Sequence, residues 1–163
     1  MMNIALVAHD SRKAELMEWV KFNAERLSQH KLFATGTTGR LLKSVFLSAA
    51  EENANVPTKA ETFKKAADNV TCLLSGPLGG DQQIGAMIAE GTIDALFFFC
   101  DNLILQGHQN DVSALVRLAS LYNIAFATNR TTADMIVTSP LMKDADYKRI
   151  IPGCIANYAN RKL

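Results

Sequence analysis

Short runs of apolar residues alternate along this chain with longer segments of helical periodicity, and this alternation restricts the fold more than any other feature. The apolar runs predict strands, and the segments between them predict helices. Repeated strand–helix units are typical of a three-layer α/β fold, in which a five-stranded, mostly parallel sheet lies between helices. The expected strands span residues 4–8, 32–34, 70–74, 93–99 and 124–127.

The helical segments carry recognisable start and stop signals. A glycine at position 91 suits the end of one helix, and Asp111 suits the N-cap of the next. We expect Trp19, Phe22 and the phenylalanines at 97–99 to lie in the core, His30 to be solvated near a helix end, and Cys100 to have a packing role. The expected helices cover residues 16–27, 41–49, 84–88, 112–119, 131–139 and 154–162, with a short edge strand at 149–151.

One stretch is longer than a single crossover helix needs. It covers the 35 residues from 40 to 74, and much of it is polar, with Pro57 as a breaker. We interpret residues 45–69 as a polar surface insertion in a single domain spanning 1–163. A short helix at 59–67 and a mobile loop are both compatible with its composition.

Composition excludes several classes of partner. Seventeen Lys and Arg against 16 Asp and Glu give a net charge of +1, so there is no overall basic field for nucleic acid. The three cysteines contain no C-x-x-C pair, which argues against a disulfide framework or a zinc site. The N-terminus lacks a signal peptide, and the longest apolar run is too short to span a bilayer. We therefore expect a cytoplasmic protein with neither membrane nor nucleic-acid partners.

Small, polar and ionisable residues are concentrated in the loops that follow the predicted strands. In parallel α/β sheets, ligands bind beyond the carboxyl ends of the strands, so these loops predict a binding site at one rim. The residues are His9, Asp10 and Lys13 after the first strand, 35–39 after the second, 75–81 after the third, 101–111 after the fourth, and 128–129 after the fifth.

The loop Thr35-Gly36-Thr37-Thr38-Gly39 combines glycines, hydroxyls and a following helix N-terminus. This combination suits a phosphate, although a tight turn capped by threonine explains it equally well. It is neither a P-loop nor a dinucleotide fingerprint. Ser75 and Gly76 offer a second contact of the same kind, and Lys13 offers a positive charge unless it is simply solvated.

Several carboxylates and an imidazole accompany this loop. Asp81 follows two glycines at a helix start, where an N-cap is the more common role and a catalytic carboxylate is the alternative. His108 with Asp111 suits acid–base chemistry. A metal site built from His9, Asp10, His108 and the aspartates is less favoured, because their spacing matches no helix-borne ligand motif.

Taken as a set, these segments resemble the methylglyoxal synthase family. The resemblance covers nearly the whole chain except the insertion, and its most specific string is Gly76-Pro77-Leu78-Gly79-Gly80-Asp81-Gln82-Gln83. The other matching segments are 4–10, 34–39, 93–98, 118–119, 127–129 and 132–134.

The resemblance implies conversion of dihydroxyacetone phosphate to methylglyoxal and inorganic phosphate, with phosphate as product and candidate inhibitor. It implies a cytoplasmic homohexamer without metal or organic cofactor. Asp81 would be the catalytic base, with His108 on the substrate oxygen and Asp111 and Asp101 supporting them. The substrate-binding residues would be His9, Asp10, Lys13, Thr35, Gly36, Thr37, Thr38, Ser75, Gly76 and, across a subunit boundary, Arg161.

Two stretches depart from the family pattern. The family's prolines are absent from Cys100-Asp101-Asn102 and from residues 107–111, which predicts a looser loop around His108. The insertion is also longer than usual. A non-catalytic phosphate-sensing module of the same fold is the alternative function, but the pattern Asp81, His108 and Asp111 favours catalysis, because binding alone requires no base.

Overall fold

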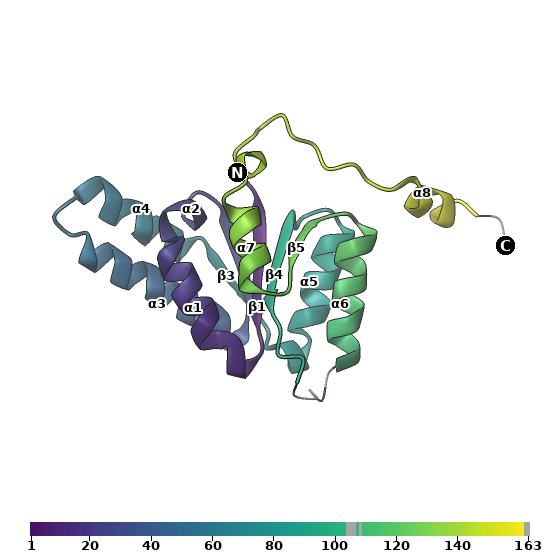
Figure 1. The fold of residues 1–163 in the computed structure, drawn as a ribbon, viewed down its shortest axis with the longest axis horizontal. Helices are drawn as coiled ribbons and strands as arrows, with labels where there is room; N and C mark the ends of the chain where they lie inside the picture. Colours follow the sequence, from purple (N-terminus) through teal and green to yellow (C-terminus); the bar gives the residue numbers. More distant parts are fainter. Residues whose placement is uncertain (104–106, 108, 162–163) are drawn as a thin grey trace.

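The computed structural model describes residues 1–103, 107 and 109–161. Its five strands form one parallel sheet in the order β3-β2-β1-β4-β5, which confirms the predicted fold class (Figure 1). The order places β1 at the centre with β2 and β4 beside it, and both faces of these three strands are covered. The strands are β1 (Asn3–Ala8), β2 (Lys31–Thr35), β3 (Val70–Leu73), β4 (Ala95–Phe99) and β5 (Ala125–Ala127).

Helices cover both faces of the sheet (Figure 1). On one face, apolar side chains of the sheet pack with α1 (Lys13–Phe22), α2 (Ala24–Leu27), α3 (Gly36–Glu52), α4 (Pro57–Asp68) and α7 (Arg130–Val137). On the other face they pack with α5 (Gly80–Ala89) and α6 (Gln109–Leu121). The short 3₁₀ turns are η1 (Asp10–Arg12), η2 (Gly76–Leu78) and η3 (Pro140–Met142).

The fourth strand is the centre of the core. All five of its residues are buried, and successive phenylalanines point to opposite faces of the sheet. The Trp19 ring packs edge-on against Phe97, with 5.3 Å between the ring centroids. The predicted burial of Trp19 and of residues 97–99 is therefore confirmed. Phe22 is the exception, since it ends α1 and 76% of its surface is exposed.

The expected helix at 16–27 is two helices, because α1 ends at Phe22 and α2 begins at Ala24. The side chain of Asn23 donates a hydrogen bond to the carbonyl of Trp19, at 3.1 Å. Such local side-chain bonds compete with helical backbone hydrogen bonds and favour a break.

The expectation that His30 is solvated is wrong. Only 6% of His30 is exposed, and its Nδ1 accepts a hydrogen bond from the backbone N–H of Met2 at 3.2 Å. Burial lowers the pKa of His30, with smaller contributions from the N-terminal ammonium and Lys143. His30 is therefore a neutral structural contact beside the start of β1.

The insertion contributes to the core. Pro57 starts α4 instead of merely breaking the chain, a position that suits its missing N–H. The predicted helix is confirmed, and its apolar side contacts α3: Phe63 is 3% exposed, and its ring centroid lies 6.4 Å from that of Phe46. The surface interpretation therefore applies only to the polar side of α4.

The last part of the chain leaves the body of the protein. After η3 it runs as an extended arm that ends in α8 (Gly153–Ala159), well away from the sheet (Figure 1). The edge strand expected at 149–151 is wrong, because this segment has no ladder pairing. Instead, the Arg149 guanidinium donates to the carbonyl of Ile93 at 3.1 Å, and the Asn123 amide donates to that of Ile150 at 3.0 Å. Among the described helices, none is both long and apolar enough to cross a membrane.

Candidate active site

A pocket of about 660 Å³ opens at the carboxyl ends of the strands. It collects residues from loops that are far apart in the sequence, as expected for a parallel sheet. Eleven residues expected at the site from the sequence line it: His9, Asp10, Lys13, Thr35, Gly36, Thr37, Thr38, Ser75, Gly76, Asp81 and Asp111. Among the described residues, the lining also includes Val7, Ala8, Pro77, Phe98 and Gly107.

One wall of the pocket is the N-terminus of α3. Thr35 is the N-cap residue, yet its side chain makes no capping hydrogen bond, which disfavours the interpretation of this loop as a threonine-capped turn. Thr38 is 1% exposed, and its Oγ1 is buried without a hydrogen-bond partner among the described residues. A buried hydroxyl normally has a partner, so this oxygen points to a ligand that supplies one. The helix N-terminus beside it favours an anion.

Lys13 adds a cation to the lining of the pocket. Its side chain is 22% exposed, and its ammonium lies 2.5 Å from a carboxylate oxygen of Asp10, which is itself 94% exposed. The hydrogen bond and the charge of Lys13 lower the pKa of Asp10. Because Asp10 is so exposed, water screens this pair, and Lys13 can exchange its partner for a bound anion at little cost.

Asp81 also lines the pocket and is buried. It is 2% exposed and is the second residue of α5. The N-cap residue of α5 is Gly79, two positions before Asp81, so the prediction that Asp81 is the N-cap residue is wrong. Gly80 has no room for a side chain, because a Cβ there would lie 2.1 Å from the Leu74 carbonyl oxygen. The close approach of α5 to the end of β3 thus places a buried carboxylate in the pocket, an environment in which Asp is rare without a specific function.

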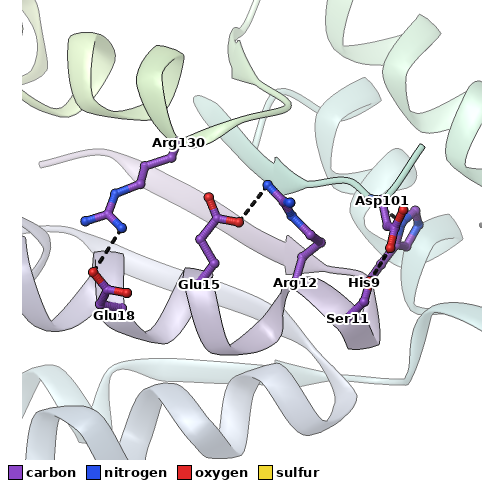
Figure 2. Close-up of polar contacts among 7 residues, drawn as sticks. All are labelled: His9, Ser11, Arg12, Glu15, Glu18, Asp101 and Arg130. Atoms are coloured by element: carbon purple, nitrogen blue, oxygen red, sulfur yellow. Dashed lines mark hydrogen bonds and ion pairs between the residues drawn. The ribbon is translucent and has the colours of Figure 1, made fainter. Parts of the chain in front are cut away.

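His9 follows β1 and is held from several sides. It is 5% exposed, and its ring packs edge-on against Phe98 with centroids 5.1 Å apart. The backbone N–H of Asp101 donates to His9 Nδ1 at 2.8 Å (Figure 2). Because Nδ1 accepts this bond, the ring proton is on Nε2.

Asp101 is near the pocket but does not line it. Its carboxylate accepts hydrogen bonds from the hydroxyl of Ser11 at 2.5 Å and from the backbone N–H of Leu103 at 3.0 Å. Its backbone N–H contacts the pocket residue His9. The neighbouring Cys100 is half-buried, and burial raises the pKa of its thiol to about 11, which fits packing better than nucleophilic chemistry.

The structure places the remaining residues predicted for the site differently from one another. Asp111 lies in the first turn of α6, which already begins at Gln109, so its predicted N-cap role is wrong. His108 lies outside the described residues. Arg161 follows α8 in the C-terminal arm, with its guanidinium 3.8 Å from the ring centroid of Tyr158, and it is not among the residues that line the pocket. Across residues 1–103, 107 and 109–161, no group of three or more His, Cys, Asp or Glu is placed to hold a metal ion.

Sequence reasoning missed Ser11. Its hydroxyl joins the loop after β1 to the loop after β4, across 90 positions of sequence. The only signal available was a hydroxyl immediately after His9 and Asp10, and such a residue is usually solvated.

Comparisons with known proteins agree with this geometry. The MGS-like domain family matches residues 15–128. The methylglyoxal synthase of Proteus mirabilis is 55% identical over 85% of this chain and 78% of its own length. That of Maridesulfovibrio salexigens is 46% identical over 99% and 97%. The crystal structure of methylglyoxal synthase from Elizabethkingia anophelis is 40% identical and superposes with a TM-score of 0.77, covering 99% of this chain and 92% of that one. The chain therefore belongs to the methylglyoxal synthase family.

Proposed function

We propose that this protein is a lyase that converts dihydroxyacetone phosphate to methylglyoxal and inorganic phosphate. One observation carries the proposal: the buried carboxylate of Asp81 shares a pocket with the N-terminus of α3, where the buried Thr38 hydroxyl lacks a partner among the described residues. A base and an anion site in one pocket are what elimination of phosphate requires. The names of the related proteins support the same reaction.

Asp81 takes the role of general base. It removes a proton from the hydroxymethyl carbon next to the substrate carbonyl, and the electron pair of the broken C–H bond forms an enediolate. The enediolate then expels phosphate as the carbon–oxygen bond breaks, and the released enol tautomerises to methylglyoxal. Burial of Asp81 excludes water from this base and strengthens the local electrostatics.

The way in which the phosphate is bound determines whether the enediolate eliminates phosphate or isomerises. The phosphate is bound by the N-terminus of α3, which includes Thr38, together with Lys13, Ser75 and Gly76. Elimination requires the carbon–oxygen bond to phosphate to lie out of the enediolate plane, whereas a bond held in the plane leads to isomerisation. The binding wall therefore contributes to catalysis by positioning.

Several residues assist Asp81 in this proposal. Since its Nδ1 accepts the Asp101 N–H, His9 has Nε2 available to donate a hydrogen bond to the substrate, and Asp10 orients Lys13 through its ion pair. By the family resemblance, His108 binds the substrate oxygen and Asp111 supports it. Asp111 lines the pocket, in agreement with this role.

Residues 1–163 act as one domain, and the protein works in the cytoplasm. It forms a homo-oligomer, which the family resemblance implies is a hexamer. The arm supports an oligomer, because α8 has no buried residue among those described and Arg161, which follows it, does not line the pocket of its own chain. In an oligomer, Arg161 can reach the phosphate of a neighbouring subunit.

The test is to incubate the purified full chain with dihydroxyacetone phosphate and to measure methylglyoxal and inorganic phosphate separately. Equal amounts of both products are expected. Phosphate binding without either product would show a phosphate-sensing module, and glyceraldehyde 3-phosphate in place of methylglyoxal would show an isomerase.

A further inference from the structure

A side-chain hydrogen bond from Ser11 joins two of the loops that build the pocket. Ser11 lies in η1, directly after β1, and its hydroxyl donates to Asp101 Oδ2 at 2.5 Å in the loop after β4 (Figure 2). The other carboxylate oxygen of Asp101 accepts the backbone N–H of Leu103 at 3.0 Å. Both oxygens therefore accept hydrogen bonds, which is the arrangement that suits an ionised carboxylate.

The Ser11 side of this contact is fixed independently of Asp101. The backbone N–H of Arg12 donates to the His9 carbonyl at 2.9 Å, and the Arg12 guanidinium lies 2.6 Å from the carboxylate of Glu15. Further along α1, Glu18 pairs with Arg130 of α7 at 3.0 Å (Figure 2). The start of α1 is thus anchored, and the Ser11 hydroxyl transmits its position to the loop that carries Asp101.

That loop in turn controls a ring in the pocket. The backbone N–H of Asp101 is the donor to His9 Nδ1 at 2.8 Å. If this N–H moves away, the imidazole can turn over or place its proton on Nδ1, and the donor at Nε2 is lost.

We propose that Ser11 is a positioning residue, which holds Asp101 so that the Asp101 amide keeps the ring proton of His9 on Nε2. Ser11 does not line the pocket and is not required to touch substrate. Its contribution is preorganisation: a donor that is already oriented needs no rearrangement during the reaction.

The kinetic test uses Ser11→Ala and the conservative Ser11→Thr. This kinetic experiment rests on the proposed lyase function. Ser11→Ala removes a hydrogen bond to a charged group, and the loss of such a bond should lower kcat about tenfold. The KM for dihydroxyacetone phosphate should be unchanged, because the residues that bind the phosphate are intact. Ser11→Thr keeps the hydroxyl and should restore kcat. In an Asp101→Ala background, Ser11→Ala should have no further effect, because the two residues act through one contact.

The spectroscopic test is independent of activity. The chain has three histidines, so two-bond nitrogen–proton NMR spectra of the rings can be assigned by single His→Gln variants. The His9 ring should have its proton on Nε2 in the wild type and in Ser11→Thr, and a mixture of both tautomers in Ser11→Ala. This measurement holds even if the protein proves to be no lyase.

Ser28→Ala is the matched control. Ser28 is another serine whose hydroxyl donates to a protein acceptor, the Glu25 carbonyl at 2.9 Å, at the end of α2. It should change neither kcat nor the His9 spectrum. The proposal is overturned if Ser11→Ala leaves the His9 tautomer as in the wild type, or if Ser11→Thr is as impaired as Ser11→Ala.

Discussion

Gly36 and Ser75 approach so closely that a Cβ on Gly36 would lie 2.4 Å from the Ser75 hydroxyl oxygen and 2.9 Å from its Cα. Gly36 also has a φ of +34°, in the region that side chains rarely adopt. The first residue of α3 and the end of β3 are thus in direct backbone contact, and the Gly36 N–H donates to the Leu74 carbonyl at 3.0 Å. This contact fixes the spacing between Gly36 and Ser75, which both line the pocket.

Gly36→Ala should therefore weaken both folding and phosphate binding. The backbone of Ser75 has to move to make room, which should raise the dissociation constant for inorganic phosphate about tenfold or more and lower the free energy of unfolding by about 1–3 kcal/mol. Isothermal titration calorimetry and denaturant unfolding measure the two effects.

Gly91→Ala is the control for this change, since Gly91 also has a positive φ, +78°, but no atom near its missing Cβ. It should cost about 1 kcal/mol of stability and leave phosphate affinity unchanged. Equal phosphate affinities in both variants would contradict the steric role of Gly36.

Asp81→Asn should separate catalysis from binding. The amide has the shape of the carboxylate but cannot accept the substrate proton, so kcat should fall about 10²–10⁴-fold, while phosphate affinity is kept. Steady-state kinetics and phosphate titration provide the comparison, with the exposed Asp68 at the end of α4, changed to Asn, as control. A parallel loss of affinity and turnover would instead make Asp81 a structural residue.

The fold could be predicted from the sequence because β1, β2 and β4 are short apolar runs that are buried on both faces, and such runs differ sharply from the helical segments between them. The location of the site could also be predicted, since parallel strands bring the loops that follow them to one edge of the sheet.

Contacts that depend on distant partners could not be read in this way. His30 is buried because Met2, 28 positions away, donates to it, and Ser11 has its partner 90 positions away. The local pattern around Phe22 is that of a core residue, yet the end of α1 leaves it exposed. Sequence periodicity describes one element at a time, whereas these outcomes depend on which elements meet.

Phe63→Ala tests whether the insertion belongs to the core. Phe63 is 3% exposed against α3, and removal of a buried phenylalanine ring costs about 3–5 kcal/mol. Phe22→Ala is the control at 76% exposure and should change stability by less than about 0.5 kcal/mol. Denaturant unfolding at a fixed protein concentration gives both values. Equal stabilities of the two variants would make α4 a peripheral element.

His30 gives the protein a specific acid sensitivity. Burial lowers its pKa in the folded state below the ordinary value of 6.5, so the unfolded chain binds a proton that the folded chain does not. The stability contributed by neutral His30 is present above pH 6.5 and falls as the pH decreases below it.

The measurement compares the free energy of unfolding at pH 7.5 and pH 5.5 in the wild type and in His30→Gln, which keeps a polar side chain near the Met2 N–H but does not titrate. The wild type should lose more stability than the variant over this interval, because all other titrating groups are common to both proteins. The same loss in both proteins would show that His30 is protonated as readily in the folded chain as in the unfolded one, and its burial would then have no role in acid sensitivity.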